Sequence, residues 1–440
     1  MKALKKAMSV LVSLLMIFTF ALPAFADSAT TYTITAPATM HQYEIYQIFT
    51  GDLNGNILSN VKWGKNGTGT EGQAVDSAII TELTAVNSKS DREKLDVVEQ
   101  YAKLDSTPVA TISNGAAYSA AAGYYLIKDK DNTVSGTDTY TTYIVQVVGN
   151  VTISPKGNVP SFVKKVKDTN DTTGATSDWQ DSADYDIGDV VPFKLEGTVA
   201  SNYADYTTYY FAFHDKAETG LSFNADSVKV YVGSTLIPST DYQLVTNPTD
   251  GDTFEVIFAN LKTITAVKAN SKITVEYTAT LNDKAVLGSK GNVNKAKLEF
   301  SNNPNEEHSG SGKPKTGETP WDNVIVFTYQ VVVNKVKTDN TPLPGAEFTL
   351  EKALKGGGKK LVAVVKNTEG TTFTFTGLDD GDYILTETKT PATYNTIDPI
   401  TFTVTAEHTV IWSTEARTEI LTGLTGSTAD GKVTFTASTD

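Results

Sequence analysis

The 440-residue sequence contains no cysteine. This absence excludes disulfide bonds and also the Cys-rich ligand spacings that are typical of structural zinc sites. After the N-terminal segment, no apolar run reaches the roughly 18 residues that a membrane-spanning helix needs. The mature chain is therefore expected to have no membrane span of its own and to obtain its durability from something other than disulfides.

Histidine and positive charge are also scarce. His41, His214, His308 and His408 stand singly, without a ligand-like companion at close spacing, which predicts structural or exposed roles rather than metal binding or general-base catalysis. The formal net charge of -14 argues against nucleic acid and against an anionic membrane surface as partners.

Sequence motifs for catalysis are missing as well. There is no GxSxG elbow, and the stretch GKPKTG lies in a polar segment rather than between a strand and a helix, where a phosphate-binding loop would be. We therefore expect no cofactor, no metal and no enzyme activity on a diffusible substrate.

What the sequence does contain begins with an export signal. The chain opens MKALKKAMSVLVSLLMIFTFALPAFADS, in which lysines precede an apolar run and the small-residue site Ala24-Phe25-Ala26. This order is typical of a secretory signal peptide, here residues 1–26, with cleavage after Ala26. The protein is expected to be exported.

The mature chain is rich in Thr, Val, Tyr and Phe, which favour β-strands. Residues 27–158 form the first expected domain. It combines short strands, such as TYTITA from Thr31 and YTTYIVQVVGNVTIS from Tyr140, with a helical stretch over 73–104, where apolar positions recur at helical spacing.

A second expected domain covers residues 159–302. Its segments FVKKVKD, VVPFKLEGTV, TTYYFAFHD, VKVYVG, TFEVIFANL, KITVEYTATL and AKLEFSNN alternate with period two, as in an all-β sandwich. A polar, Gly/Pro-rich linker is expected at 303–321, followed by a third domain of strands at 322–440.

Long stretches of the chain resemble the sortase-assembled backbone (major) pilins of Gram-positive bacteria. In the third domain, VVVNKVKTDNTPLPGAEFTLEK and TFTFTGLDDGDYILTETKTPATY are similar to the Cna-B-type module, whose second part is called the E-box. In the second, YDIGDVVPFKLEGTV, FAFHDKAETGLSF and NVNKAKLEFSNNPN look like the middle domain of these pilins. The resemblance covers nearly all of the mature chain and implies tandem immunoglobulin-like (Cna-type) β-sandwich domains.

The first domain adds MHQYEIYQIFTGDL with SNVKWG, and it ends in VTISPK, which resembles the pilin motif. Ser154 stands where family members commonly have Tyr. The resemblance implies that Lys156 is the acceptor to which a class C sortase joins the C-terminal threonine of the next subunit. Whether this domain has an isopeptide bond of its own is left open.

The resemblance also implies intramolecular Lys–Asn isopeptide bonds, each catalysed by a buried Asp or Glu. Such a bond needs a neutral amine and a protonated acid, and burial favours both of these uncharged forms. In the third domain Glu387 shares a strand face with Tyr383 and Leu385, and the E-box match makes it the expected catalyst. The lysine is expected to be Lys335, with Lys337 on the same face as the alternative.

In the second domain, Lys164 alternates with apolar residues and is expected on the inner face of the first strand. The resemblance implies Asp215 as the acid and Asn294 as the amide. Asn302 shares the strand face of Asn294 and remains the alternative. The first and last strands are expected to pair, so that the bond closes nearly the whole domain into a loop.

The sequence ends at GKVTFTASTD without an LPxTG-type signal and has no asparagine after Asn395. We expect that it stops short of a sorting signal, and we leave the partner of Lys335 open. The expected function is a structural shaft subunit of a cell-surface pilus attached to the cell wall, with further copies of the chain, sortase, and minor, tip and basal pilins as partners. The alternative is a wall-anchored or tip adhesin that binds a host ligand.

Overall fold

The structure is a computed structural model. It describes residues 18–19, 31–54, 57–85, 91–134, 138–140, 142–147, 149–153, 158–305, 313–367, 369–413, 416–428 and 433–435. The chain divides into two compact units. The first comprises 1–159, 201–208 and 301–317, and the second comprises 160–200, 209–300 and 318–440.

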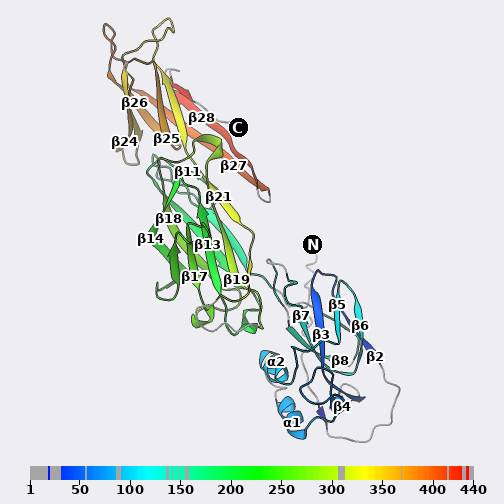
Figure 1. The fold of residues 1–440 in the computed structure, drawn as a ribbon. Helices are drawn as coiled ribbons and strands as arrows, with labels where there is room; N and C mark the ends of the chain where they lie inside the picture. Colours follow the sequence, from blue (N-terminus) through cyan, green and yellow to red (C-terminus); the bar gives the residue numbers. More distant parts are fainter. Residues whose placement is uncertain are drawn as a thin grey trace, which may run out of the picture. The chain divides into compact units, whose positions relative to one another are not determined.

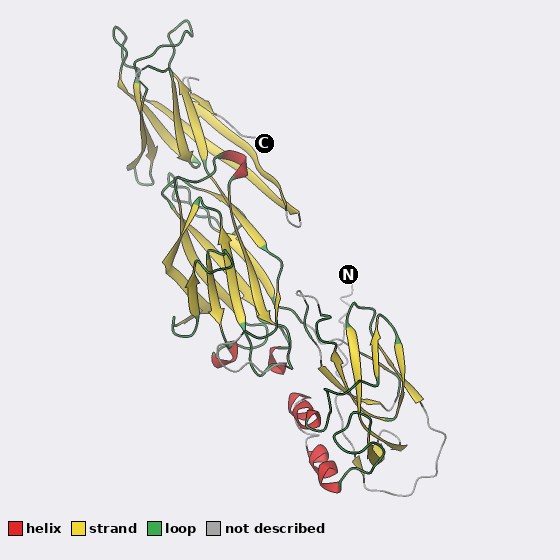
Figure 2. Cartoon of the chain, in the orientation of Figure 1, coloured by secondary structure: helices red, strands yellow, loops and turns green. Residues whose placement is uncertain are grey.

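Strands dominate both units, and helices are few (Figures 1 and 2). This agrees with the mainly β class expected from the alternating segments. Within the described residues, no helix is both long and apolar enough to cross a membrane.

The first unit is built on a six-stranded sheet. Along it lie β1 (Phe18–Thr19), β4 (Ile57–Trp63), β3 (Gln42–Asn54), β7 (Gly123–Asp129) and β8 (Thr142–Val147), with β5 (Ala110–Ser113) paired to β3. A smaller sheet contains β6 (Ala117–Ala121), β2 (Thr31–Thr35) and β9 (Val151–Thr152).

Two short helices, α1 (Ser77–Ala85) and α2 (Asp91–Glu99), lie in the stretch where helical spacing was expected. Leu83 and Val98 are fully buried and pack in one cluster with Phe49, Leu58 and Tyr124. The apolar spacing therefore predicted the helical character, and both helices pack against strands of the first unit.

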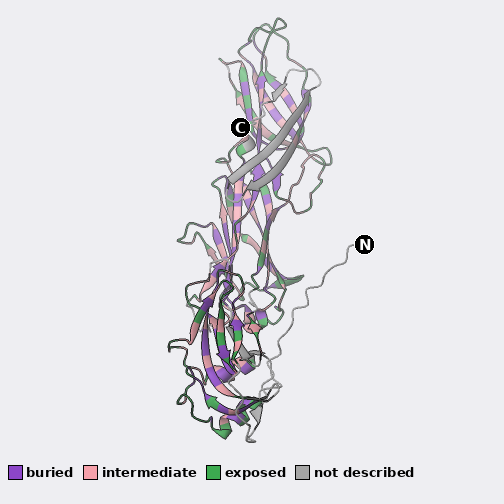
Figure 3. Ribbon diagram, turned by 90° about the vertical axis from the view of Figure 1, so that its right-hand side faces the viewer, coloured by how far each residue is buried: buried purple, intermediate pink, exposed green. Residues whose placement is uncertain are grey.

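The second unit contains a sandwich of two sheets. One holds β10 (Ser161–Val166), β12 (Val190–Thr198), β18 (Lys272–Leu281), β14 (Leu221–Val232) and β15 (Thr235–Ile237). The other holds β11 (Ser182–Asp184), β21 (Asp322–Phe327), β19 (Asn292–Ser301), β13 (Phe211–Ala217), β17 (Phe254–Phe258) and β16 (Gln243–Thr246). Figure 3 shows buried positions alternating with less buried ones along the strands, as the period-two pattern requires.

The expected pairing of the first and last strands of this sandwich is wrong. Strand β10 pairs with β12, whereas β19 pairs with β13 and β21 in the opposite sheet. The alternation of side chains predicts which face of a strand is buried, but it does not identify the neighbouring strand. Lys164 and Asn294 consequently lie on different sheets.

A second sandwich of the same unit follows. One sheet holds β25 (Thr372–Leu378), β22 (Tyr329–Asn334) and β29 (Val433–Phe435). The other holds β24 (Lys359–Lys366), β23 (Glu347–Ala353), β26 (Gly381–Lys389), β27 (Ile400–Ser413) and β28 (Ala416–Thr428).

Only one residue, Thr328, separates β21 of the first of these sandwiches from β22 of the second. Thr328 is fully buried, and its Oγ1 donates to the carbonyl of Leu378 at 3.2 Å. The two sandwiches are therefore joined by a strand-to-strand connection at the point where β21 ends.

Candidate functional site

Lys164 lies in the middle of β10, and its side chain is fully buried. Its neighbour Lys165 is partly exposed and pairs with Asp181, as the alternation predicted. The backbone N–H of Lys164 donates to Oδ2 of Asp322 at 2.7 Å, which fixes β10 beside β21. An amine in such a position must find its partners inside the sandwich.

Those partners come from the opposite sheet. Asp215 lies on β13 opposite Ala296 of β19, and Asn294 lies two residues before that alanine, opposite Ala217. Because side chains alternate along a strand, Asp215 and Asn294 point to the same inner face. Both are fully buried, and Asp215 Oδ2 contacts the Lys164 amine directly.

Tyr277 of β18 connects all three groups. Its hydroxyl donates to Oδ2 of Asp215 at 2.6 Å. It accepts one hydrogen bond from Lys164 Nζ at 2.7 Å and one from Asn294 Nδ2 at 2.9 Å. A phenol has one proton and two lone pairs, so this set of three hydrogen bonds uses its full capacity.

Two oxygens of the cluster are left over. Oδ1 of Asp215 and Oδ1 of Asn294 are buried, and neither has a hydrogen-bond partner among the described residues. An unpaired buried polar atom costs free energy, so each of these two oxygens would be stabilised by a hydrogen-bond donor. A proton on Oδ1 of Asp215 would give that carboxyl a donor for the Asn294 carbonyl.

The surroundings favour the uncharged forms of the pair. Burial lowers the pKa of Lys164 and raises the pKa of Asp215, and in each case it outweighs the attraction between the two opposite charges. The rings of Phe193 and Tyr277, at 5.4 and 5.3 Å from the amine, form the apolar surroundings. A neutral amine beside a protonated acid and an amide has the groups that amide exchange needs.

The alternative amide, Asn302, lies elsewhere. It belongs to the first compact unit, and its Nδ2 donates to the carbonyl of Asp138 at 3.3 Å. The geometry therefore favours Asn294 of the two asparagines that the strand pattern left open.

A second buried Lys–acid pair lies in the next sandwich. Nζ of Lys335 is 2.9 Å from Oε1 of Glu387, and both side chains are nearly inaccessible to solvent. Oε2 of Glu387 also accepts from the backbone N–H of Ile397 at 3.0 Å. Lys337, the alternative lysine, is exposed, so the pair is formed by Lys335.

The burial pattern of β26 agrees with the predicted strand face. Tyr383, Leu385 and Glu387 are buried, whereas Ile384 and Thr386 between them are only partly so. Glu387 thus occupies an inner position, as its parity indicated.

Some of the predicted residues cannot be placed. Lys156, with residues 154–157, lies outside the described residues, and so does His308. The side chain of His408 is also outside the described part of the chain.

The remaining histidines have carboxylate partners that sequence spacing did not reveal. Nδ1 of His41 is 2.7 Å from Asp129, and its Nε2 is 2.7 Å from Asp138. His214 is surrounded by four carboxylates, described below. Both histidines are buried, so neither is a surface residue.

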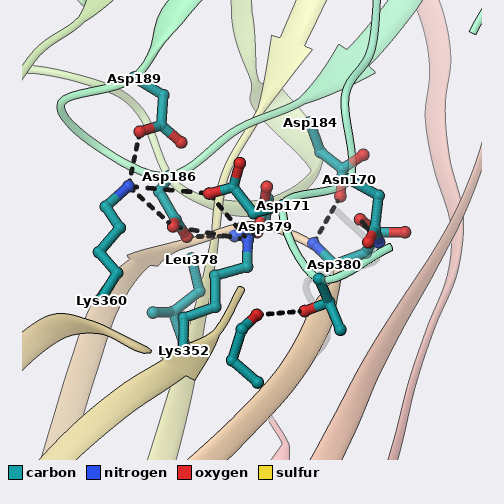
Figure 4. A network of polar contacts seen from close by, with 12 residues as sticks. Asn170, Asp171, Asp184, Asp186, Asp189, Lys352, Lys360, Leu378, Asp379 and Asp380 are labelled. Carbon is teal, nitrogen blue, oxygen red and sulfur yellow. Dashed lines mark hydrogen bonds and ion pairs between the residues drawn. The ribbon is translucent and has the colours of Figure 1, made fainter. Parts of the chain in front are cut away.

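A third buried lysine lies where the two sandwiches of the second unit meet (Figure 4). Lys352 of β23 is fully buried and contacts Asp379 at the turn before β26. Its Nζ is also 3.5 Å from Oδ2 of Asp186 and 3.9 Å from Oδ2 of Asp171. Asp186 and Asp171 belong to the preceding sandwich, so Lys352 bridges the two.

Lys360 extends this network. Its Nζ is 2.6 Å from Oδ1 of Asp189 and 3.2 Å from Oδ2 of Asp186. Oδ1 of Asp186 accepts from the backbone N–H of Asp379 at 3.0 Å. Charge-assisted and backbone hydrogen bonds therefore hold the segment 170–189 to the following sandwich, as Figure 4 shows.

Sequence reasoning missed Tyr277 and the Lys352 network. The alternation of KITVEYTATL shows that Tyr277 faces inward, but it does not distinguish a tyrosine that links three polar groups from one that only packs. For Lys352, the inward parity in EFTLEK was a readable signal, since a lysine at a buried strand position needs a partner.

Comparison with known proteins gives two family matches. Residues 187–304 match the Gram-positive pilin backbone subunit 2, Cna-B-like domain. Residues 329–418 match the SpaA prealbumin-like fold domain.

A curated relative is the trypsin-resistant surface T6 protein of Streptococcus pyogenes serotype M6, 26% identical over 268 residues. The match covers 57% of this chain and 46% of that protein, so it spans less than half of the relative's length.

Among solved structures, the T6 backbone pilin of serotype M6 Streptococcus pyogenes is similar in fold, with a TM-score of 0.57 at 21% identity, over 94% of this chain and 96% of that one. The full-length major pilin SpaD of Corynebacterium diphtheriae gives a TM-score of 0.49 at 19% identity, over 85% and 91% of the two chains. The chain is thus similar to Gram-positive backbone pilins, with a match to a Cna-B-like domain followed by a match to a SpaA prealbumin-like domain.

Proposed function

We propose that this protein is the shaft subunit of a sortase-assembled pilus, and that a Lys164–Asn294 isopeptide bond stabilises its middle sandwich. The single observation that carries the proposal is the fully buried set of Lys164, Asp215, Asn294 and Tyr277. Burial of an unreacted amine and carboxyl group costs free energy whether or not they are charged, and the reaction replaces the ionisable amine with an amide that cannot become charged.

The reaction needs no external reagent. The neutral Lys164 amine attacks Cγ of Asn294, while a proton on Asp215 hydrogen-bonds the amide oxygen and polarises it. Collapse of the tetrahedral intermediate breaks the bond from Cγ to Nδ2. The amine of Lys164 gives up one proton to Asp215, and Asp215 delivers a proton to the leaving Nδ2. One ammonia is released, and Asp215 is regenerated.

Tyr277 has a positioning role in this scheme. Burial raises its pKa well above the ordinary value, so the hydroxyl keeps its proton. As a phenol it orients Asp215 Oδ2 while holding both the amine and the amide nitrogen. The reacting groups are thereby collected before the reaction begins, which is the main requirement for an intramolecular step.

The Lys335–Glu387 pair has the first two components of the same chemistry. We propose Glu387 as the catalyst of a second bond formed by Lys335, and we leave its amide partner open. The direct contact of 2.9 Å between the two buried side chains supports this assignment.

An internal covalent bond would help a shaft subunit to resist pulling forces. Noncovalent stability of about 5–15 kcal/mol per domain is easily exceeded when subunits are pulled in single file. A bond between Lys164 and Asn294 would connect the two sheets of the sandwich and enclose most of its chain in a covalent loop. Joining subunits through Lys156 by a class C sortase, with minor, tip and basal pilins added, would complete a covalent fibre on the cell wall.

Mass spectrometry tests the bond. The intact mass of the folded wild type should be lower by one ammonia for each bond, and a crosslinked Lys164–Asn294 peptide should be found after digestion. Asp215→Ala should retain that ammonia, Asn294→Ala should show the full mass calculated for its sequence at this site, and Asn302→Ala should behave as wild type. An unlinked Lys164 peptide from folded wild type would contradict the proposal.

Polymerisation separates a shaft subunit from the alternative adhesin. The chain, provided with a sorting signal, is incubated with a class C sortase and compared with its Lys156→Ala variant. A ladder that depends on Lys156 supports the shaft role. A single terminal addition, or a ladder unaffected by the substitution, would favour a tip adhesin or another acceptor.

A further inference from the structure

The outer face of the sheet that carries Asp215 holds a second polar cluster, centred on His214. His214 precedes Asp215 on β13 and points to the opposite face, because side chains alternate along a strand. On this outer face, Glu255 of β17 lies directly opposite His214. The turn 247–253, which joins β16 to β17, brings Asp250 and Asp252 to the same place.

Four ligand atoms converge there. Nδ1 of His214 is 3.2 Å from Oδ2 of Asp252, 3.3 Å from Oε1 of Glu255 and 3.9 Å from Oδ2 of Asp250. All four atoms lie within 4.8 Å of one another. Tetrahedral ligands at about 2.0–2.2 Å from a zinc ion would be separated by about 3.3–3.6 Å, so the first two spacings are close to those required.

The other ring nitrogen has a partner of its own. Nε2 of His214 is 3.1 Å from Oε2 of Glu299, and both residues are buried. A carboxylate in this position holds a proton on Nε2, so that Nδ1 carries either a second ring proton, shared with Asp252, or a metal ion in its place. A lone pair facing carboxylate oxygens is repulsive unless a cation or a second ring proton lies between them.

The turn is held in place independently of these carboxylates. The backbone N–H of Thr253 donates to the carbonyl of Asp215 at 2.6 Å, and Thr253 Oγ1 accepts from the N–H of Ala217 at 2.9 Å. Asn247 and Gly251 have positive φ values of 51° and 86°, which gives the turn its tight path. The ligands are therefore positioned by backbone contacts as well as by their mutual charges.

The charge around His214 differs from that of the other acidic cluster in this unit. Around Asp171, Asp186, Asp189 and Asp379, two lysines are inserted among the carboxylates. Near His214 the cation in contact with the ligands is Lys216, whose Nζ is 3.9 Å from Oδ1 of Asp252. A second lysine, Lys297, lies opposite His214 on β19, and its Nζ is 2.6 Å from Oε2 of Glu318. Three ligand carboxylates and Glu299 thus face one histidine and two lysines at the edge of the cluster.

We propose that His214, Asp250, Asp252 and Glu255 form a binding site for a divalent metal ion of the zinc type, with Glu299 as the residue that orients the histidine. One imidazole nitrogen and three carboxylates form a ligand set that suits zinc better than calcium, which prefers oxygen ligands only. The site lies outside the isopeptide cluster and does not depend on the proposed function.

A bound ion would tie the turn 247–253 to the middle of β13. Because Asp215 is the next residue on that strand, the ion would hold in place the strand that carries the proposed catalyst. Metal binding would then stabilise the folded state in proportion to the free ion concentration.

The test uses the untagged mature chain and Zn²⁺ alone. Calorimetric titration at pH 7.5 should show one Zn²⁺ per chain, with weaker binding at pH 5.5, since a proton competes for Nδ1. Glu299→Gln should weaken the affinity by about 10–100-fold. His214→Asn should weaken it at least as much, and His41→Asn, which removes a histidine flanked by only two carboxylates, should leave it unchanged.

Two further measurements guard against a folding defect. Asp250→Asn alters a side chain that is half exposed, and it should weaken Zn²⁺ binding while the melting temperature of the metal-free protein stays unchanged. In histidine-labelled wild type, Zn²⁺ should shift the Nδ1 resonance of His214 and leave Nε2 protonated. Zn²⁺ binding that survives His214→Asn, no saturable binding, or binding of Ca²⁺ in preference to Zn²⁺ would overturn the proposal.

Discussion

The hydroxyl of Tyr277 lies 2.6 Å from Oδ2 of Asp215 and donates to it, although the two residues are on opposite sheets. The same hydroxyl accepts from both groups that the proposed reaction joins, Lys164 and Asn294. Tyr277 is therefore the residue through which the two sheets share one polar network.

Tyr277→Phe should slow formation of the isopeptide bond by about 10²-fold, because it removes the hydroxyl that positions the carboxyl, the amine and the amide before the reaction. The ring that stacks on Phe193 is kept, so the fold should survive. Intact mass, followed over time after refolding, gives the rate. Tyr242→Phe, on a tyrosine of the same sandwich that packs against Phe258, should react at the wild-type rate. Equal rates for both variants would reduce Tyr277 to a packing residue.

Lys352→Met should destabilise the second unit by about 3–5 kcal/mol, because it removes the cation in contact with the buried carboxylate of Asp379 and leaves Asp186 with Lys360 alone. Urea denaturation followed by circular dichroism measures the change. The matched control is Lys359→Met, which removes the half-exposed partner of Glu351 and should cost at most about 1 kcal/mol. If the two variants lost equal stability, the buried network would contribute no more than a surface ion pair.

Asp168→Asn should stabilise the protein near neutral pH. Burial, together with the charges of Asp184 and Asp380, raises the pKa of Asp168 to about 8 from 3.8. The folded state therefore keeps a proton that the unfolded chain releases above about pH 4, so stability falls as the pH rises from about 4 to 8.

The asparagine variant should lose this part of the pH dependence and gain at least about 1.4 kcal/mol at pH 7.5, the equivalent of one pKa unit. Urea midpoints at several pH values provide the measurement. A variant that is less stable than wild type at pH 7.5 would show that the Asp168 carboxylate is ionised and well solvated.

His41 should contribute stability in mildly acid solution. Burial lowers its pKa, but hydrogen bonds to Asp138 and Asp129 and the charges of these residues more than compensate, so the pKa is raised above 6.5. A raised histidine pKa gives stability that is fully present below about pH 6.5 and is lost as the pH rises through the folded value.

His41→Asn should consequently reduce the melting temperature more at pH 5.5 than at pH 8.5. Thermal unfolding at the two pH values decides the matter. A larger loss at the alkaline pH would mean that the neutral ring is the form bound by the two carboxylates.

The sequence predicted best what depends on local alternation. Lys164 and Glu387 were both identified as inward-facing ionisable residues on strands, and both are buried beside a group of opposite charge. Strand pairing could not be predicted in the same way, because an alternation of period two shows which face of a strand is buried but not which strands lie beside it. The separation of β10 and β19 into different sheets follows from the topology of the whole sandwich.

Contacts between residues that are far apart in the sequence were also not predicted. His214 was judged to lack companions, yet Asp250 and Asp252 reach it from a turn more than thirty residues later in the chain. The signal that could have found them is the pair of acids around Gly251 in TDGDTFEV, just before a strand of the same sheet. Pairing that turn with His214 requires knowing that β13 and β17 are neighbours.

Thr328 alone connects β21 to β22, and it is buried and hydrogen-bonded. This connection can hardly be extended under tension, since a single residue spans at most about 3.3–3.6 Å. A long flexible linker would extend first when the chain is pulled. The connection through Thr328 instead transmits the force directly from β21 to β22. Pulling on the second unit therefore loads β21 and β22 directly, while the contacts of Lys352 with Asp186 and Asp379 oppose rotation of one sandwich against the other at Thr328.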